Sequence, residues 1–204
     1  MLTVVGGRVQ AELRGQSCLP LPDIAAIRKS IASTRTFGRL LLKWEEIREA
    51  IAHYATRAAE KLREEGLEAA HLSVPMQTNP HDGDPWYAKH AAVTIVPTSD
   101  AKDLIRHATE LGRTIWIPRY RYFKAGVILS DLRPAGSQGR MFASRNPSQS
   151  AAVMAALDAV NARFGSGTLR PGSTGLKRTW SPRQSLLSAR YTTRLEEIVR
   201  ATSW

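Results

Sequence analysis

The side chains most able to carry out chemistry here are five histidines, one cysteine and several paired carboxylates. Histidines at positions 53, 71, 81, 90 and 107 have no metal-ligand spacing with Cys18. His81, Asp82 and Asp84 come nearest to a cation site, but a loop rich in Gly and Pro uses such residues to form turns. The sequence therefore predicts no metal site and no cofactor in this chain.

The paired carboxylates are poor candidates for acid–base catalysis. Glu45–Glu46, Glu64–Glu65 and Glu196–Glu197 are neighbours in expected helices, and adjacent helical residues do not face each other. Residues 165–167, Gly-Ser-Gly, lack the strand–loop–helix context of a phosphate loop. We therefore do not expect this chain alone to be an enzyme.

The residue types favour binding instead. Residues 28–37 interleave small hydroxyls with cations, and residues 119–124 form a second basic and aromatic cluster. Hydroxyls and Arg forks hold phosphates without reading bases. The predicted DNA-binding residues are Lys29, Ser30, Ser33, Arg35, Thr36, Arg39, Arg119, Arg121 and Lys124. An amphipathic sheet edge with outward charges is the alternative interpretation.

The net charge supports a polyanionic partner. Lys and Arg number 29 against 18 Asp and Glu, which gives +11 and a pI near 10.4. Nucleic acid is the commonest such partner, a solubilising surface is the alternative, and no segment has the basic amphipathic pattern of a membrane binder. The chain has no apolar run of about 18 residues and no signal peptide at residues 1–13, and Cys18 is its only cysteine. These features predict a cytoplasmic protein without membrane contact.

The elements that must position these residues follow from hydrophobic periodicity. Helices are predicted at residues 4–13, 44–62 and 101–115, and strands at 28–37, 72–78, 91–96 and 121–129. The order β-α-β-β-α-β predicts an α+β fold of the split βαβ type. We expect four strands in one sheet, two helices on one face and an open opposite face. Pro75 suggests an edge strand or a bulge.

A C-terminal extension follows a linker rich in Pro, Gly, Ser and Arg. A third helix is predicted at residues 150–164, with an apolar stripe from Val153 to Phe164. Because that stripe needs a partner, and Trp180 and Tyr191 add apolar area, we expect the extension to pack on the rest of the chain.

Several strings resemble one protein family, the UmuC-type Y-family (translesion) DNA polymerases. Near the start these are Val5-Gly-Gly-Arg8, Glu12-Leu-Arg-Gly15, Ser33-Thr-Arg-Thr-Phe-Gly38 and residues 54–63. Further on they are Val96-Pro-Thr-Ser-Asp100, Tyr122-Phe-Lys-Ala-Gly-Val127, Leu157-Asp-Ala-Val-Asn161, and Trp180 followed by Leu187-Ser-Ala-Arg-Tyr-Thr-Thr193. Ala189 stands where the tail signature of the family has proline.

The resemblance implies four regions. They are the end of a thumb and a linker at residues 1–22, a DNA-binding little finger at 23–132, a linker at 133–149 and a UmuC-type extension at 150–204. The palm and fingers of the family, with their Mg²⁺-binding carboxylates, would lie before Met1. The implied function is the non-catalytic, DNA-gripping and clamp-docking portion of an error-prone polymerase in SOS mutagenesis and DNA repair.

The resemblance also implies partners. Gln138, Met141 and Phe142 match the place and pattern of a family motif that binds the replication sliding clamp. Template–primer DNA, a processed UmuD-type subunit and RecA are the other implied partners. One alternative is a free-standing interaction protein that docks on the clamp or a polymerase and regulates mutagenesis without gripping DNA. Another, a nucleotidyltransferase in its own right, lacks the paired metal-binding carboxylates.

Overall fold

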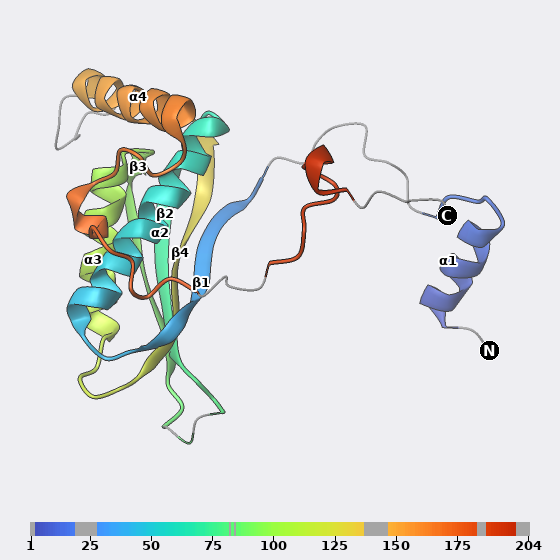
Figure 1. Cartoon of the computed structure of the whole chain (residues 1–204), viewed down its shortest axis with the longest axis horizontal. Helices are drawn as coiled ribbons and strands as arrows, with labels where there is room; N and C mark the ends of the chain where they lie inside the picture. The colour runs from blue at the N-terminus through green and yellow to red at the C-terminus, as the bar shows by residue number, and fades with distance from the viewer. Residues whose placement is uncertain are drawn as a thin grey trace.

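The computed structural model describes residues 3–18, 28–81, 83, 85–136, 147–182 and 187–198 (Figure 1). Its core is one antiparallel sheet of four strands: β1 (Ser30–Leu41), β2 (Leu67–Thr78), β3 (Ala88–Thr98) and β4 (Tyr122–Pro134). The spatial order is β1-β4-β2-β3, so β1 and β3 form the edges. The first and last strands are therefore direct neighbours.

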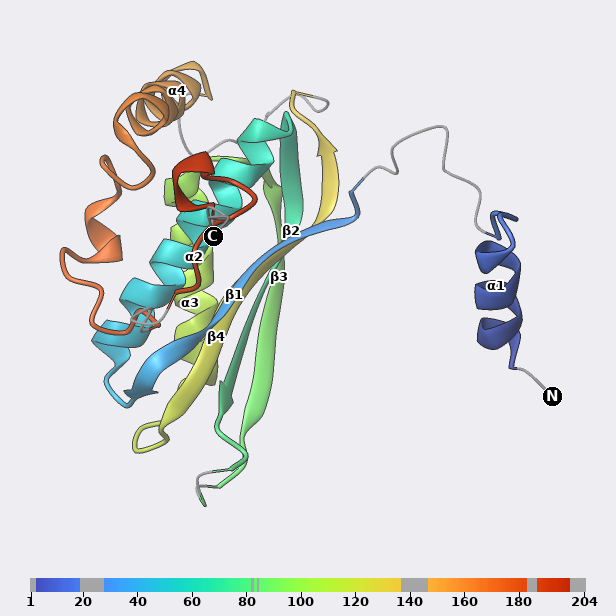
Figure 2. The same cartoon turned by 45° about the vertical axis from the view of Figure 1, so that its right-hand side comes forward.

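Two helices cover one face of this sheet, and no helix of the described part of the chain packs on the other face (Figure 2). They are α2 (Trp44–Glu64) and α3 (Ala101–Ile115). The predicted α+β fold, with both helices on one face, is confirmed. Most strand ends run further than predicted, by up to five residues, because main-chain pairing continues past the last apolar residue of the pattern. β1 and β4 begin slightly later than predicted, at Ser30 and Tyr122.

Helix α2 forms where its sequence combines an apolar stripe with complementary end charges. Ile47, Ile51 and Leu62 are fully buried against the sheet. Glu45 and Glu46 lie in the first turn, and basic residues lie in the last, which complements the helix dipole. In α3 the Asp100 carboxylate accepts a hydrogen bond from the backbone N–H of Lys102 at 2.7 Å.

The register of β1 against β4 separates the two faces of the sheet. Ile31 lies opposite Leu129, and both are buried under the helices. Because successive side chains alternate between faces, Ser33 and Arg35 share the helical face with Ile31. Thr36 lies opposite Lys124, so these two side chains are on the open face. A register shift follows Thr36.

Pro75 lies in an inner strand, so the expectation of an edge position was wrong. β2 is paired with β3 on one side and β4 on the other. Pro75 pairs with His90 of β3, whereas the β4 pairs step from Ser73 directly to Met76. The missing proline N–H is thus accommodated at a gap in the β2–β4 ladder, opposite Gly126.

The C-terminal extension packs on the helical layer, as predicted. Helix α4 (Pro147–Phe164) begins three residues earlier than expected, because Pro is favourable in the first turn of a helix. Its Met154 and Leu157 are buried, but Val153 and Phe164 are exposed, so only part of the predicted stripe is covered. The Asp158 carboxylate accepts two hydrogen bonds from Arg63 of α2, at 2.6 and 2.7 Å.

Beyond α4 the chain returns along α2 through a short 3₁₀ helix, η1 (Gly172–Thr174). The Trp180 side chain is 2% exposed and contacts the rings of His53 and Tyr54. The Gly38 N–H of β1 donates to the Trp180 carbonyl at 2.9 Å. Tyr191, before η2 (Leu195–Glu197), is 51% exposed, so its predicted burial was wrong.

The N-terminal helix α1 (Val4–Leu13) has the predicted bounds. The Thr3 hydroxyl caps it by accepting from the Gly6 N–H, and none of its residues is buried. Among the described residues, no helix is both long and apolar enough to cross a membrane.

Candidate nucleic-acid interface and a cationic pocket

The open face of the sheet mixes polar and small side chains, and the positions assigned to it below carry no carboxylate. We define the open face by the strand register as the side chains that alternate with the buried ones. They are Ser30, Ala32, Thr34, Thr36, His71, Ser73, Pro75, Gln77, Ala88, His90, Ala92, Thr94, Val96, Lys124, Gly126, Ile128 and Ser130. Hydroxyls, an amide and a lysine can all donate hydrogen bonds to phosphate oxygens. This composition suits a surface that lies against a polyanion.

Gly126 is needed for close packing within this face. A Cβ at Gly126 would lie 2.3 Å from Cγ2 of Thr34 on β1. Because Gly126 has no side chain, the Thr34 side chain can lie across β4 at this point of the open face.

The structure brings only part of the predicted DNA-binding set onto the open face. Ser30, Thr36 and Lys124 lie there, and the exposed Lys29 directly precedes β1. Ser33 and Arg35 point to the opposite, helical face. The predicted residues of β1 do not form one basic surface, because strand alternation divides them between two faces.

The remaining predicted residues lie near the far end of β1. Arg39 pairs with Glu46 of α2 and contacts the Thr179 hydroxyl at 3.5 Å. Arg119 is exposed and has a positive φ of 72° in the α3–β4 loop, which Arg121 ends. Since strands rise about 3.3 Å per residue, Lys29 lies roughly 36 Å along β1 from this group.

A cavity of about 370 Å³ lies on the helical side, between β1, α2 and the C-terminal extension. We call it the cationic pocket. Its cationic lining residues are Arg35 of β1, Arg57 and Lys61 of α2, and Arg170 and Arg178 of the extension. Glu60 is the one carboxylate among the described lining residues, and it pairs with Arg57.

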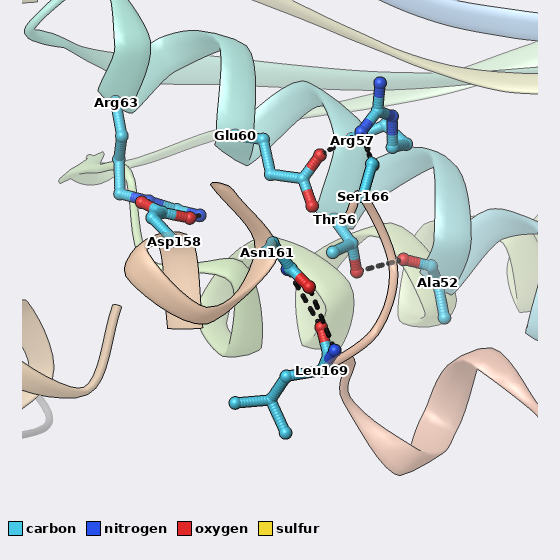
Figure 3. Close-up of polar contacts among 9 residues, drawn as sticks. All are labelled: Ala52, Thr56, Arg57, Glu60, Arg63, Asp158, Asn161, Ser166 and Leu169. Atoms are coloured by element: carbon cyan, nitrogen blue, oxygen red, sulfur yellow. Dashed lines mark hydrogen bonds and ion pairs between the residues drawn. The ribbon is translucent and has the colours of Figure 1, made fainter. Parts of the chain in front are cut away.

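Specific contacts fix the walls of the cationic pocket. Figure 3 shows Arg57 reaching from α2 to the Ser166 hydroxyl, a hydrogen bond of 2.6 Å. The Asn161 side chain both donates to the carbonyl and accepts from the N–H of Leu169, each at 2.9 Å (Figure 3). Arg170 donates to the Leu176 carbonyl at 2.8 Å. The extension is therefore held in place at several points around the cavity.

The crowding of cations changes the ionisation of neighbouring groups. Burial, and then the charges of Arg178 and Arg57, lower the pKa of His53 from 6.5 to about 4. Burial raises the pKa of Tyr54 to about 12, although the nearby Arg35 opposes that change. Burial and the charges of neighbouring arginines also lower the pKa of Arg178. An electropositive, partly desolvated site of this kind favours anions.

Sequence reasoning missed this pocket because its cations come from three separate segments. Arg57 and Lys61 are four residues apart on one helix, a spacing that places both on the same side. Arg170 and Arg178 belong to the C-terminal extension, and no motif in the sequence links them to α2 or β1. Ser166 and Gly167 line the pocket although their Gly-Ser-Gly string lacks phosphate-loop context.

The other sequence predictions fall outside what the structure describes. Gln138, Met141 and Phe142, the predicted clamp-binding residues, lie between the described ranges 85–136 and 147–182. Asp82 and Asp84 are also outside the described residues. Within the described part of the chain, no group of three or more His, Cys, Asp or Glu side chains could hold a metal ion.

The four-stranded sheet with two helices on one face and a helical extension places the chain in the little-finger class of folds. Residues 28–141 match the family described as the impB/mucB/samB family C-terminal domain, and the chain belongs to that family. Residues 151–201 match a second family, described as a domain of unknown function.

Individual relatives agree with this assignment. The chain is 39% identical to Protein UmuC of Salmonella typhimurium over 201 residues, which is 97% of this chain and 48% of the relative. It is 36% identical to Protein MucB of Escherichia coli over 202 residues, 98% of this chain and 48% of that protein. Protein SamB of Salmonella typhimurium is 35% identical over 202 residues, 97% and 47% of the two chains. The chain thus spans about half the length of these relatives.

Proposed function

We propose that this chain is the DNA-binding portion of a UmuC-like error-prone translesion polymerase, and that it holds template–primer duplex through phosphates. The family match supports the polymerase setting. The observation that carries the binding role is the open face of the sheet. This face is polar, has no carboxylate among its described positions and carries Thr36 beside Lys124.

The chemistry of the open face favours contact that is independent of base sequence. Its donors are mainly short hydroxyls, with Gln77, two histidines and one lysine beside them, whereas base reading needs side chains that reach into a groove. The residues that support the grip are Ser30, Thr36 and Lys124, with Lys29 at the start of β1. Arg119 and Arg121 extend the proposed contact along the far end.

The wider proposal includes partners and setting. The clamp-binding residues Gln138, Met141 and Phe142 would tether the polymerase to the replication clamp. A processed UmuD-type subunit and RecA complete the proposed set of partners, and Mg²⁺ would be held by catalytic segments outside this sequence. The proposed cellular role is SOS mutagenesis during DNA repair in the cytoplasm.

Salt-dependent binding to duplex DNA tests the proposal. We expect similar affinity for three unrelated duplexes and a steep fall between roughly 50 and 200 mM salt, since each phosphate contact contributes about −0.9 to the slope of log K against log salt. Lys124→Ala should weaken all three duplexes alike and reduce the slope by about that amount. Lys102→Ala is the matched control, because Lys102 is exposed on α3 on the helical side of the sheet.

Unchanged affinity and slope in Lys124→Ala would show that the open face is not the duplex site. If the wild-type chain bound no duplex but still bound the clamp, the alternative would be favoured: an interaction protein that docks on the clamp or a polymerase without gripping DNA.

A further inference from the structure

The cationic pocket lies on the opposite side of the sheet from the open face, so a duplex on the open face does not occupy it. Arg35 of the pocket and Thr36 of the open face are consecutive in β1 and therefore point to opposite faces. The function proposed above gives this pocket no role. Its occupant must be found from its own chemistry.

The charge of the pocket is strongly unbalanced. Arg35, Arg57, Lys61, Arg170 and Arg178 face one carboxylate, Glu60. Within the described part of the chain, no carboxylate forms an ion pair with Arg35, Lys61 or Arg178. Five cations around one small cavity repel one another, and a bound anion would relieve that repulsion.

Unpartnered donors give a second, independent observation. The Tyr54 hydroxyl, the Arg178 Nε and the Trp180 Nε1 are buried and have no hydrogen-bond partner among the residues that the structure describes. All three residues line the cationic pocket, and Tyr54 and Trp180 are each only 2% exposed. Buried donors are nearly always paired, and these three can all donate to an acceptor. They suit a ligand rich in oxygen acceptors.

The volume of the pocket and the charge density of the candidate ligands restrict the class of ligand further. A cavity of about 370 Å³ is within the range of small-molecule sites, which begins near 300 Å³. Carboxylates of a peptide bring one charge per side chain, whereas linked phosphates bring several charges within a few ångströms. Arg forks also match the geometry of phosphate oxygens.

We propose that the cationic pocket binds a phosphate-rich anion, through the Arg35, Arg57, Lys61, Arg170 and Arg178 cations and the free donors of Tyr54 and Trp180. Two sources share this chemistry: the di- or triphosphate of a free nucleotide, and the terminal 5′-phosphate of a DNA strand. In both cases the phosphate oxygens accept hydrogen bonds and the arginines neutralise their charge.

Titration of the full chain with pyrophosphate, ATP and matched oligonucleotides with a 5′-phosphate or a 5′-hydroxyl tests this proposal. Binding is followed by calorimetry and by the NMR signal of the Trp180 indole N–H, which is assigned with Trp180→Phe. We expect that signal to shift on binding. The double variant Arg35→Ala, Lys61→Ala changes two side chains of the pocket rim and should bind about tenfold more weakly or worse, with an unchanged melting temperature. Lys102→Ala, on α3, should bind like the wild type.

These probes distinguish the two possible sources of the phosphate, a free nucleotide and the 5′ end of a DNA strand. Tight binding of pyrophosphate and ATP identifies a free nucleotide phosphate, and a preference for the 5′-phosphorylated strand over its 5′-hydroxyl counterpart identifies a strand end. The proposal is overturned if no phosphate probe binds at millimolar concentration, if the double variant binds as well as the wild type, or if only a glutamate-rich peptide shifts the indole signal. Because this test uses different side chains from the duplex test, each can fail without the other.

Discussion

His53 reports on the electrostatics of the cationic pocket at the scale of one residue. Burial and the charges of Arg178 and Arg57 lower its pKa from 6.5 to about 4, so we expect a neutral imidazole at pH 7. An NMR titration should show this low midpoint, and saturating pyrophosphate should raise it, because a bound anion stabilises the imidazolium. A midpoint near 6.5 without ligand would contradict the electropositive character of the pocket.

The same shift makes stability depend on pH. Between about pH 6.5 and pH 4 the unfolded state binds the His53 proton and the folded state does not. The contribution of His53 to the free energy of unfolding should therefore be complete above about pH 6.5 and should decrease as the pH falls toward 4. Urea unfolding across this range should show a shallower dependence in His53→Gln, whose neutral amide does not titrate. If the free energy of unfolding depended on pH in the same way in the wild type and in His53→Gln, the titration of His53 would not be what couples stability to pH.

Gly38 is the residue that lets the C-terminal extension approach β1. A Cβ at this position would lie 2.2 Å from the Ser181 carbonyl oxygen, and that neighbour is backbone. Gly38→Ala should therefore displace the extension and lower the free energy of unfolding by about 1–3 kcal/mol, with faster proteolysis between residues 165 and 182. Gly172→Ala, where no atom lies within 4 Å of the new Cβ, is the control. Equal stability of the two variants would show that the extension adapts without cost.

At the scale of elements, the segment between β4 and α4 carries the clamp prediction. Phe142 would be the anchor of a short peptide in a hydrophobic groove, and such an aromatic typically supplies about 2 kcal/mol or more. Phe142→Ala should abolish measurable clamp binding while the melting temperature and duplex affinity change little. Surface-plasmon binding to the clamp, beside thermal unfolding, measures both. A lower melting temperature with intact clamp binding would instead make Phe142 a core residue.

The elements themselves were largely predictable from sequence. Apolar periodicity located α2 and α3, alternation located β2, and composition with the order of the elements located the other three strands. Local patterns could not supply the pairing of β1 with β4, which divides Arg35 from Lys124. Local patterns also could not show that Pro75 lies in an inner strand. The gap that this proline leaves in the β2–β4 hydrogen-bond ladder is tolerated because the facing residue is Gly126.

The two sites differ in how far the sequence could predict them. Thr36 and Lys124 were predicted from the composition of two separate clusters, and the register of β1 against β4 places them side by side. The cationic pocket joins residues near position 35, position 57 and position 178, which only the folded chain brings together. Tyr191 shows the opposite error: an aromatic residue in a distinctive motif was expected to be buried and is exposed.

At the scale of the whole molecule, the chain has a net charge of +11, and described cations lie on both sides of the sheet. Lys124 lies on the open face, whereas five cations line the cationic pocket on the helical side. Net charge alone predicted a polyanionic partner but could not show how these cations are divided between the two sides.

The whole chain is expected to lack polymerase activity of its own. The paired carboxylates of the sequence are on helix surfaces, and Glu46 is engaged by Arg39. Incubation of the chain with primer–template, Mg²⁺ and nucleotides should therefore give no extension, in an assay that an active polymerase validates. Measurable extension by the purified chain would show that it is a nucleotidyltransferase in its own right.

The hydrogen bond from the Gly38 N–H to the Trp180 carbonyl also has a consequence for biosynthesis. It ties the first strand of the sheet to a segment that is synthesised only after all four strands. The sheet and its helices can assemble while the chain is still being made, since domains fold as units from the N-terminal side. The cationic pocket therefore forms only after the sheet, and a chain that stopped at the end of β4 would have an open face but no pocket.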